Sequence, residues 1–363
     1  MPNYFAPSFR IDVNGSRLAG DVSKNITQLS IVSKPDMLDE FSFTLVNSLP
    51  KMRWTHTEDR KLFEPGSAVK ILMGYVDDLH VMMEGEITEV APLFPDSGVP
   101  TVGIRGHSRM HRLRGDNKTR TFQNTNAKEI AEKIGRDAGL EVKADEVDVQ
   151  QDYVIQPNQS DLDFLKSMAK SLHFEVLVQN KTLIFRKAKE SEAKVFTFIW
   201  YGTQESFAPA PDTLPLKSFA PQMNALAPSN KVVCRGYDMK SKQAFVSEAG
   251  ADGQATLMGG QQSGAAHSAS AFKMQRSTVL VTSPFDTKAE GDRMAKATYE
   301  QKAMGYVGGH AETIGVPELW SGQVVELKGL GPVFNGRYYI SEATHTIGEN
   351  GYQTSFEVKR NAS

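Results

Sequence analysis

Two histidines, His107 and His111, lie four residues apart, a spacing that would place both imidazoles on one face of a helix and could bind zinc. No glutamate follows His107, as the HExxH pattern of zinc hydrolases requires. The same stretch is crowded with arginines, which disfavour a bound cation: Arg105, Arg109, Arg112 and Arg114. The segment therefore favours surface histidines in a loop or at a strand end over a metal site.

Two clusters of carboxylates could in principle supply the acid and base of glycoside cleavage. They comprise Asp145, Glu146 and Asp148 in one place, and Asp36, Asp39 and Glu40 in another. The first cluster falls between a predicted helix and a predicted strand, and both clusters fit solvated turns better than an acid–base pair.

The nucleophile candidates are equally weak. Cys234 is the one cysteine and lies between Val233 and Arg235 in a predicted strand, which is typical of a buried thiol. Glycines neighbour Ser16 and Ser321, but no GxSxG pattern surrounds either serine. The glycine-rich stretches at 258–260 and 308–309 lack the phosphate-loop pattern. The sequence therefore assigns no catalytic, cofactor-binding or metal-binding residue and predicts that the chain is not an enzyme.

The composition indicates a soluble globular chain. Its 363 residues suggest two or three domains, 40% are hydrophobic, and the net charge is −2. So small a charge argues against attraction of the whole chain to nucleic acid or anionic lipid. The basic run 105–120 has no interleaved aromatic residue, which favours a subunit contact or a solvated face over a single-strand nucleic-acid platform.

Three absences bear on location. A single cysteine cannot form an intramolecular disulfide, which fits folding in a reducing compartment. No stretch approaches about 18 consecutive apolar residues, so no membrane insertion is expected. The first fifteen residues have neither a basic nor an apolar region of a secretory signal, so we expect assembly in the cytoplasm.

The first third of the chain reads as short strands separated by turns, typical of a small barrel or sandwich. The predicted strands are Phe9–Val13, Ile26–Val32, Glu40–Val46, Ala68–Met73, Val81–Val90 and Pro100–Gly106. Asn14-Gly15 marks a hairpin turn, and Glu84-Gly85 is expected to break the fifth strand.

The middle block, about 118–190, is predicted to be a small α+β unit. Asn126 with Glu129 forms a capping-box pattern ahead of a helix that Gly139 ends. Ser160 with Asp163 opens a second helix. Two short strands follow, Phe174–Val178 and Thr182–Phe185.

The last block returns to strands after two irregular segments. Ser206–Ser229 is predicted to be a connector or extended arm, and Glu248–Ser270 a mobile loop, because it contains few bulky residues. A helix is expected from Thr287 to Ala303. Further strands are predicted at Lys231–Gly236, Ser277–Thr282, Tyr306–Ile314, Gln323–Leu327, Arg337–Ile347 and Tyr352–Val358. In the last of these, Tyr352, Thr354, Phe356 and Val358 share one face, which is expected to fill a barrel.

The two β blocks resemble each other. Each has a glycine-led strand, at Gly66 and at Gly322, then a glycine-containing hairpin, and then a closing strand that carries a basic residue. Short antiparallel strands look alike without common origin, so composition alone leaves open whether this is an internal repeat.

At this point the residues resemble the phage late control protein D family, and are similar to the N-terminal hub part of VgrG-type spike proteins. The matching segments, in order, are Glu84–Val90, Val102–Arg109, Leu113-Arg114, Thr119–Phe122, Ala127–Leu140, Gln159–Leu165, Phe174–Val176, Gly315–Leu319, Gly322–Leu327, Phe334–Ile340, His345 and Tyr352–Val358. They span most of the chain, with the connector and the glycine-rich loop as gaps.

The resemblance implies a mainly β fold with two related tube-like β-barrel domains and a small α+β domain. The expected divisions are 1–117, 118–192 and 193–363, with loop 248–270 in the last. It also implies a homotrimeric tail or baseplate hub of a contractile phage tail or injection system, joining a six-fold tube to a three-fold spike. The expected partners are a tail tube or tube-initiator ring protein, a spike protein and other baseplate proteins.

The chain ends at Ser363, directly after the second block, so the spike is expected to be a separate protein. Two alternatives stay open: a tail-tip cell-wall hydrolase, and a carbohydrate- or receptor-binding module. The second would draw on few aromatics, since only Trp54, Trp200 and Trp320 are present. Trp320 precedes a predicted strand and fits a core or rim position.

Overall fold

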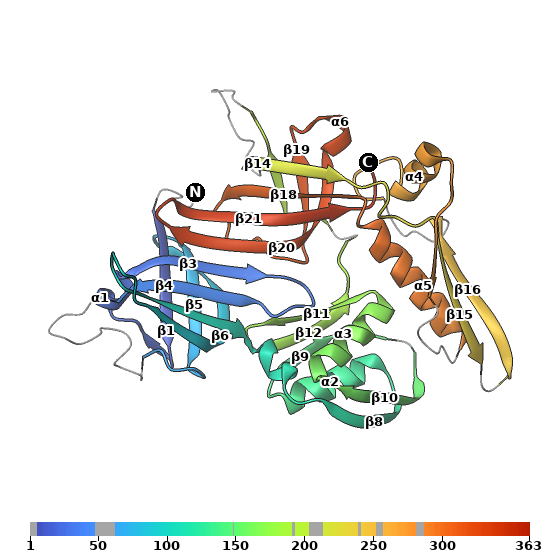
Figure 1. Ribbon diagram of the computed structural model, residues 1–363, viewed down its shortest axis with the longest axis horizontal. Helices are drawn as coiled ribbons and strands as arrows, with labels where there is room; N and C mark the ends of the chain where they lie inside the picture. The colour runs from blue at the N-terminus through green and yellow to red at the C-terminus, as the bar shows by residue number, and fades with distance from the viewer. Residues whose placement is uncertain are drawn as a thin grey trace.

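The computed structural model describes residues 6–47, 62–147, 149–190, 193–202, 213–238, 241–251, 257–280 and 287–363. Strands account for 51% of the residues and helices for 20%, so the predicted mainly β fold is confirmed. Figure 1 shows an elongated molecule in which two β blocks lie side by side, with an α+β unit beside them and a helix-and-hairpin arm at one end.

The first β block is an antiparallel sheet. Its strands are β1 (Pro7–Val13), β2 (Ser16–Arg17), β3 (Ile26–Ser33), β4 (Glu40–Val46), β5 (Ala68–Tyr75), β6 (Asp78–Leu93) and β7 (Thr101–Ser108), with a short helix α1 (Gly20–Ser23). The spatial order is β3-β4-β7-β6-β5-β1-β2. As the alternation predicted, Phe41, Phe43 and Leu45 are buried.

The expected break at Glu84-Gly85 is wrong, because β6 runs through both residues as one long strand. A side chain on Gly85 would overlap the carbonyl oxygen of His107 on β7. The glycine therefore permits close approach of a neighbouring strand rather than a turn. The Asn14-Gly15 turn is confirmed, since both residues have positive φ, +49° and +80°.

The α+β unit follows and has its own hydrophobic core. It comprises the 3₁₀ helix η2 (Arg109–Arg114), β8 (Lys118–Thr125), α2 (Ala127–Asp137), β9 (Glu141–Ala144), β10 (Gln151–Gln159), α3 (Asp161–Leu172), β11 (Phe174–Gln179) and β12 (Thr182–Lys187). Both predicted helix starts are confirmed. Asn126 and Glu129 form the capping box, and the Ser160 hydroxyl accepts from the Asp163 amide at 3.1 Å.

The second β block closes into a six-stranded barrel. Its strands are β13 (Phe196–Ile199), β14 (Thr213–Met223), β18 (Val307–Ile314), β19 (Val324–Lys328), β20 (Gly336–Gly348) and β21 (Gly351–Arg360), with the short helix α6 (Gly331–Phe334) between β19 and β20. The predicted face of β21 is confirmed, since Tyr352, Thr354, Phe356 and Val358 are all buried. The connector prediction is wrong for 213–223, which form β14 within the barrel wall.

An arm inserted between β14 and β18 contains a three-stranded sheet and two helices. Its elements are β15 (Lys231–Asp238), β16 (Gln243–Gly250), α4 (Gly264–Phe272), β17 (Ser277–Leu280) and α5 (Lys288–Ala303). The predicted helix over 287–303 is confirmed, and the Thr287 hydroxyl caps it by accepting from the Glu290 amide at 3.3 Å. Ala289 is exposed, whereas Ala295, Tyr299 and Ala303 are buried.

The expected mobile loop 248–270 is wrong where the structure describes it. Residues 248–250 belong to β16, and α4 begins at Gly264, capped by the Ser263 hydroxyl, which accepts from the Ala266 amide at 3.2 Å. A side chain on Gly264 would overlap the ring of buried Tyr306. Small residues here allow close packing, so a shortage of bulky side chains did not indicate disorder. Residues 252–256 lie outside the described residues.

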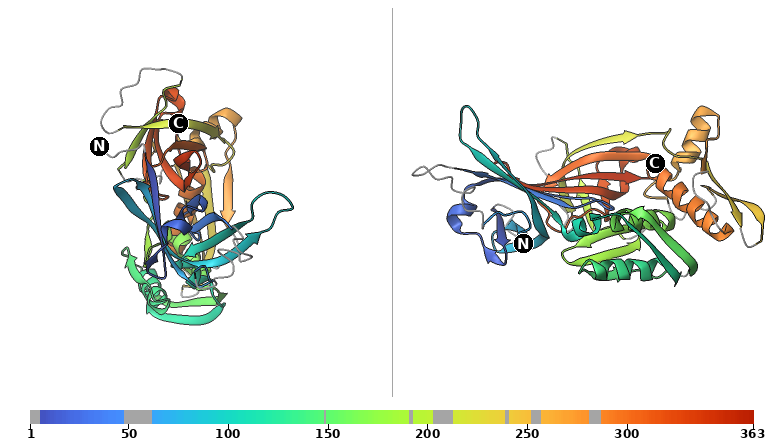
Figure 2. Two further views of the ribbon diagram at one scale, coloured as in Figure 1. Left: turned by 90° about the vertical axis from the view of Figure 1, so that its left-hand side faces the viewer. Right: turned by 60° about the horizontal axis from the view of Figure 1, so that its bottom comes forward.

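The two blocks share one continuous sheet, because β20 of the second block pairs antiparallel with β3 of the first. The partners run from Ala343 opposite Ser33 to Ile347 opposite Leu29. The Tyr75 hydroxyl of β5 also donates to the Gly315 carbonyl at 2.8 Å. Both views in Figure 2 show the blocks joined along this seam, with the β6–β7 hairpin projecting from the first block.

Candidate functional site

The predicted resemblance of the two blocks holds at the level of strand neighbours. The first block has the order β1-β5-β6-β7-β4-β3, and the second has β13-β19-β20-β21-β18-β14. The glycine-led strands, the hairpins and the closing strands that the sequence paired therefore occupy matching places, as β5-β6-β7 and β19-β20-β21.

The blocks also share two backbone irregularities. A β-bulge on β6 follows Ile87, and one on β20 follows Ile340. A second bulge on β3 follows Ile26, and one on β14 follows Leu216. Bulges are local departures from a regular ladder, so two at matching points are strong evidence that the blocks correspond residue by residue.

The backbone hydrogen bonds at the start of the glycine-led strand are the same in both blocks. The Gly66 amide donates to the Ile87 carbonyl at 2.8 Å, and the Gly322 amide donates to the Ile340 carbonyl at 2.9 Å. Each isoleucine amide donates back to the residue after the glycine, Ser67 or Gln323, at 2.9 Å. Both glycines have positive φ, +92° and +78°, which explains why glycine occupies both places.

Side-chain volume is exchanged between matching positions, which hides the repeat in the sequence. In the first block the Phe41 ring fills space over Gly85 and Gly106, where any side chain would crowd or overlap it. The strand pairings place Gly309, Tyr338 and Val358 at the corresponding three positions of the second block. There the aromatic residue of the three is Tyr338 on β20, the glycine lies on β18, and the ring against that glycine is Phe219 of β14.

The α+β unit contacts both blocks at matching residues of β6 and β20. Glu86 of β6 accepts from Arg112 and pairs with His111 at 2.8 Å, both from η2. Its counterpart on β20 is Tyr339, which donates its hydroxyl proton to Glu175 of β11. The unit is therefore attached to each block through the same point of its wall.

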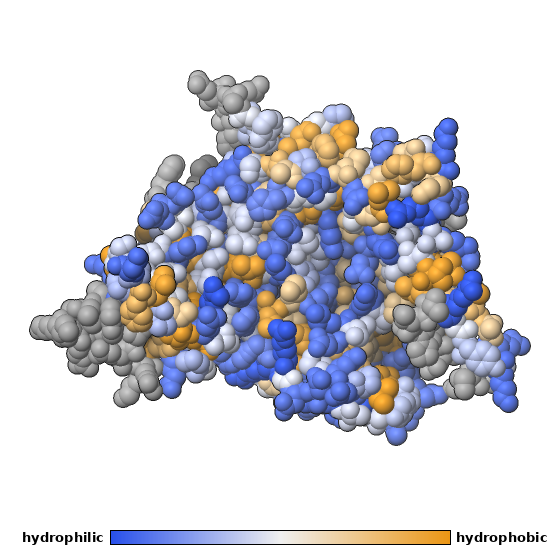
Figure 3. Space-filling view, in the orientation of Figure 1, coloured by the Kyte–Doolittle hydropathy of each residue, from blue (hydrophilic) through white to orange (hydrophobic). Residues whose placement is uncertain are grey.

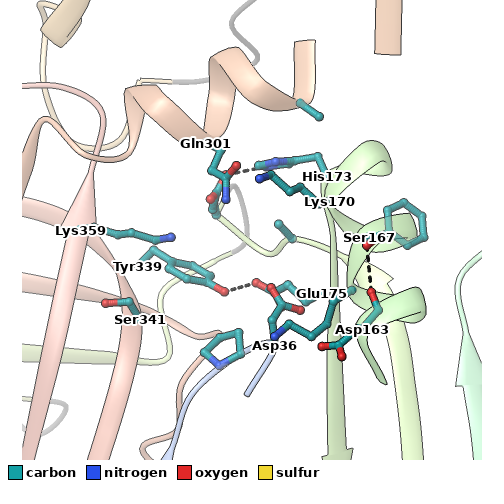
Figure 4. A pocket seen from close by; sticks show the side chains of 16 residues that line it. Asp36, Asp163, Ser167, Lys170, His173, Glu175, Gln301, Tyr339, Ser341 and Lys359 are labelled. Carbon is teal, nitrogen blue, oxygen red and sulfur yellow. Dashed lines mark hydrogen bonds and ion pairs between the residues drawn. The ribbon is translucent and has the colours of Figure 1, made fainter. Parts of the chain in front are cut away.

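A cleft of about 520 Å³ marks the second of these contacts. Figure 4 shows side chains from β11, α3, α5, β20 and the turn after β3 facing it, including Asp36, Lys170, Glu175, Gln301 and Tyr339. The turn after β3, the consecutive elements α3 and β11, α5, and β20 are separate parts of the chain that meet at this cleft. We call it the junction, because it fixes where these parts lie relative to one another.

Glu175 is a buried carboxylate of this junction. Burial raises its pKa to about 7, although the Arg186 guanidinium, 3.3 Å away, favours the ionised form. Arg186 also donates to the Gly322 carbonyl at 3.4 Å, at the start of the β19 turn. One carboxylate thus links β12, β20 and the β19 turn.

Asp36, in the turn between β3 and β4, lines the same junction cleft, which corrects its interpretation as a solvated residue. Asp39 of the same turn faces a separate cavity, beside Ser33 and Ser321. The Asp36 carboxylate accepts from the Val176 amide at 2.8 Å, and the Asp36 amide donates to the Val176 carbonyl at 3.1 Å. Burial raises the pKa of Asp36, and it raises the pKa of Asp39 to about 7 against the hydrogen bond from the Lys34 amide.

His173 joins α3 to α5 beside the cleft. It ends α3 in the left-handed conformation and lies 2.9 Å from Glu190 and 3.9 Å from Glu300 of α5. Burial lowers its pKa, but the hydrogen bond and charge of Glu190 outweigh this, so the pKa lies above its ordinary value. The imidazole lies between two carboxylates from different parts of the chain.

The remaining sequence candidates have structural partners. His107 ends β7 with its ring 3.1 Å from the Thr88 hydroxyl, as a strand-end histidine was expected to lie. Asp145 accepts from the Lys187 amide at 2.9 Å, and Glu146 pairs with Lys128, so both stabilise the turn after β9. Asp148 and Trp54 lie outside the described residues.

Several basic residues of the run 105–120 form ion pairs within the chain. Arg105 lies 3.7 Å from Glu89, and Lys118 and Arg120 each lie 2.6 Å from the buried carboxylate of Asp161. With Arg112 on Glu86, these pairs stabilise the α+β unit and its attachment. The run is neither a free patch nor a simple solvated face.

Cys234 is buried in β15 as predicted, and burial raises the pKa of its thiol. Ser321 is buried and shares a 2.8 Å hydrogen bond with Ser33, across the seam between the blocks. Trp320 packs against the core of the first block, as a core or rim position requires. Among the described residues, no three His, Cys, Asp or Glu side chains gather in a way that could hold a metal ion.

His345 is a buried residue whose structural role the sequence did not indicate. It accepts at Nδ1 from the Tyr352 hydroxyl at 2.9 Å and donates from Nε2 to the Leu319 carbonyl at 2.8 Å. Burial lowers its pKa to about 4, so the ring is neutral and secures the turn before β19.

Apolar side chains also remain exposed on the outer surface. On the face seen in Figure 3 they gather over α4 and α6, where Phe272 and Val333 are 48% and 45% exposed. None of the helices within the described ranges is long and apolar enough to cross a membrane.

The complete fold is that of phage tail proteins. The 43 kDa tail protein of prophage MuSo2 from Shewanella oneidensis matches with a TM-score of 0.72 and 12% identity, over 98% of each chain. A tail protein from Neisseria meningitidis matches with a TM-score of 0.70 and 14% identity, over 98% of this chain and 97% of that one. An E. coli component of the type VI secretion system matches at 0.58 and 11% identity, over 97% of this chain and 77% of that one.

The family model described as the Alg8 N-terminal domain matches residues 5–349, and the chain belongs to this family. A comparison with curated proteins gives no match. The resemblance to tail-hub proteins drawn from the sequence is confirmed in the fold, while membership of late control protein D in particular stays a prediction.

Proposed function

We propose that the chain is a structural hub of a contractile phage tail or phage-like injection system. It would act as a homotrimeric adaptor between a six-fold tail tube and a three-fold spike. The observation that carries this proposal is the correspondence of the two β blocks, down to their bulges. Three chains with two related blocks each present six similar units, which can match six-fold and three-fold partners together.

The partners follow from this geometry. A tail tube or tube-initiator ring protein would contact one end of the six blocks, and a spike protein with other baseplate proteins would contact the opposite end. A net charge of −2 suits stacked rings, because strongly charged rings of like sign would repel one another.

We propose the segments 1–117, 118–192 and 193–363 as the functional divisions, with η2 of the first contributing Met110 and Leu113 to the core of the second. The role is mechanical rather than enzymatic: Asp36, His173 and Glu175 of the junction cleft are engaged in hydrogen bonds and ion pairs that hold the chain's own parts together. Assembly would take place in the bacterial cytoplasm, and the product would be part of a virion tail or injection particle.

Native mass spectrometry of the purified chain, over a range of concentrations, tests the trimer. We expect a species of three copies that becomes dominant as concentration rises. A stable species of six copies would contradict the adaptor role. Zymography on purified cell walls tests the non-enzymatic role, and lysis that disappears on a single change such as Glu175→Gln would overturn it.

A further inference from the structure

The β20–β3 seam joins one edge of β20 to one edge of β3. The corresponding edges in the other block of each pair are those of β6 and β14, and no partner strand lies beside them in the described part of the chain. On β6, the pairing with β5 ends at Glu86, and Ile87 still bonds to Gly66 and Ser67, so the same edge is open along 88–93. On β14, the pairing with β13 covers only 213–215, which leaves that edge open along 216–223.

The matched ladders identify which residues correspond. Pairing with β7 and β21 aligns Val90–Leu93 of β6 with Ala343–Thr346 of β20. Pairing with β4 and β18 aligns Ala220–Met223 of β14 with Ser30–Ser33 of β3. Within one chain, Ala343–Thr346 and Ser30–Ser33 are partners across the seam. Their counterparts are therefore the two open edges.

We propose that the open β6 edge of one copy pairs antiparallel with the open β14 edge of a second copy, repeating the internal seam between chains. The register follows from the seam: Val90 opposite Met223, Ala91 opposite Gln222, Pro92 opposite Pro221, and Leu93 opposite Ala220. The inference rests on the proposed homotrimer and specifies its interface.

This contact is head to tail, because a β14 edge meets a β6 edge rather than another β14 edge. A heterologous contact forms a closed ring only if its rotation returns to the start. Each chain already contains one such contact at β20–β3, so a second contact of the same geometry turns the next block by the same angle. Three chains close a ring of six blocks when that angle is one sixth of a turn.

The composition of both edges fits a selective contact. Pro92 and Pro221 face each other in the proposed register, and neither can donate a backbone hydrogen bond. Proline on an edge strand discourages pairing with unrelated strands. Leu93 and Met223 are 61% and 36% exposed, which provides apolar surface for a matched partner.

Engineered disulfides test the register directly. Ala91→Cys and Gln222→Cys are introduced together in the full chain with Cys234→Ala, so that no native thiol remains. The matched internal control is Val32→Cys with Thr344→Cys, the corresponding pair across the seam. An off-register control combines Ala91→Cys with Ser218→Cys. Each protein is oxidised at a concentration where the trimer is expected and run on a non-reducing gel.

We expect the 91/222 protein to form interchain disulfides in a ladder that stops at three chains, and the 32/344 control to form only an intrachain bond. The off-register pair should stay largely reduced. Absence of the interchain bond while the 32/344 control oxidises would overturn the proposed interface. A trimer still present by native mass spectrometry would then leave the proposed function standing with a different contact.

Discussion

The two β blocks have the same strand order, but within the described residues only the second closes into a barrel. There, β13 lies between β14 and β19 and pairs with both in parallel. In the first block, β1 pairs antiparallel with β5, while β3 pairs with β20 of the neighbouring block. The edges of β14 and β3 occupy matching positions. The edge of β14 pairs with β13 and so helps to close the barrel, whereas the edge of β3 pairs with β20 and joins the two blocks.

The two blocks also differ in the connections between matching strands. A short turn at 34–39 joins β3 to β4, whereas the matching connection from β14 to β18 contains the whole arm with α4 and α5. The framework common to both blocks should therefore be the stable part, and we expect changes there to have the largest effects.

The largest effect is expected from emptying the barrel core. Phe356 is 1% exposed, with its ring centroid 5.2 Å from that of Phe198, so Phe356→Ala should cost about 3–5 kcal/mol of unfolding free energy. The matched change in the first block is Ile104→Ala, which should cost about 2–5 kcal/mol. Urea denaturation measures both. If Phe356→Ala costs less than about 1 kcal/mol, the face of β21 is not the core we describe.

The pH dependence of the junction should be nearly as large. Glu175 has a folded-state pKa of about 7, above its ordinary value of 4.5, so the folded state retains a proton that the unfolded state has released. The stability from this group is complete below pH 4.5 and is lost as the pH rises through 7. Relative to Glu175→Gln, the native chain should lose about 3 kcal/mol over this window.

Urea titrations at several pH values measure that difference. Glu357→Gln, which changes an exposed residue on the outer face of β21, provides the control and should leave the native pH slope in place. A Glu175→Gln chain with the same slope as the native chain would show that this carboxylate does not titrate in the junction.

A smaller loss of stability is expected where a glycine lies under the Phe41 ring. A methyl group on Gly106 would overlap the Phe41 ring and the Glu86 carbonyl oxygen, so Gly106→Ala should cost about 1–3 kcal/mol. Gly103 lies on the same strand with its nearest neighbour 3.7 Å from the added carbon, and Gly103→Ala should change stability far less. Equal costs at both positions would contradict the close packing of the Phe41 ring over Gly106.

The smallest effect concerns the arm. Ser263 caps α4, so Ser263→Ala should cost about 1 kcal/mol, typical of a lost helix cap. Ser270→Ala, near the opposite end of the same helix, is the control. Thermal unfolding followed by circular dichroism detects the difference, and no shift for Ser263→Ala would restore the view that this segment contributes little.

The sequence predicted most strands and three of the four helices that begin at a side-chain cap, because alternation and capping are local signals; α4 was missed. The Asn126–Glu129 capping box and the β21 face are examples. It did not predict that small residues pack tightly at Gly264, or that Gly85 lies inside a continuous strand, because both depend on a distant neighbour. The repeat was only partly visible because Phe41, Gly85 and Gly106 exchange volume with Gly309, Tyr338 and Val358.

The junction could not be predicted from the sequence, because it too depends on contacts between distant residues. Asp36, Glu175 and Tyr339 come from three distant parts of the chain, and no local pattern connects them. Only the β11 strand and the turn after β3 could be expected from the sequence, without their contact.

Electron microscopy of the assembled particle tests the central claim most directly. We expect three copies of the chain in one ring, with six β blocks alternating between the first and second kind around a pseudo-six-fold axis. A ring of six chains at this position, or three chains whose blocks do not lie in one ring, would contradict it.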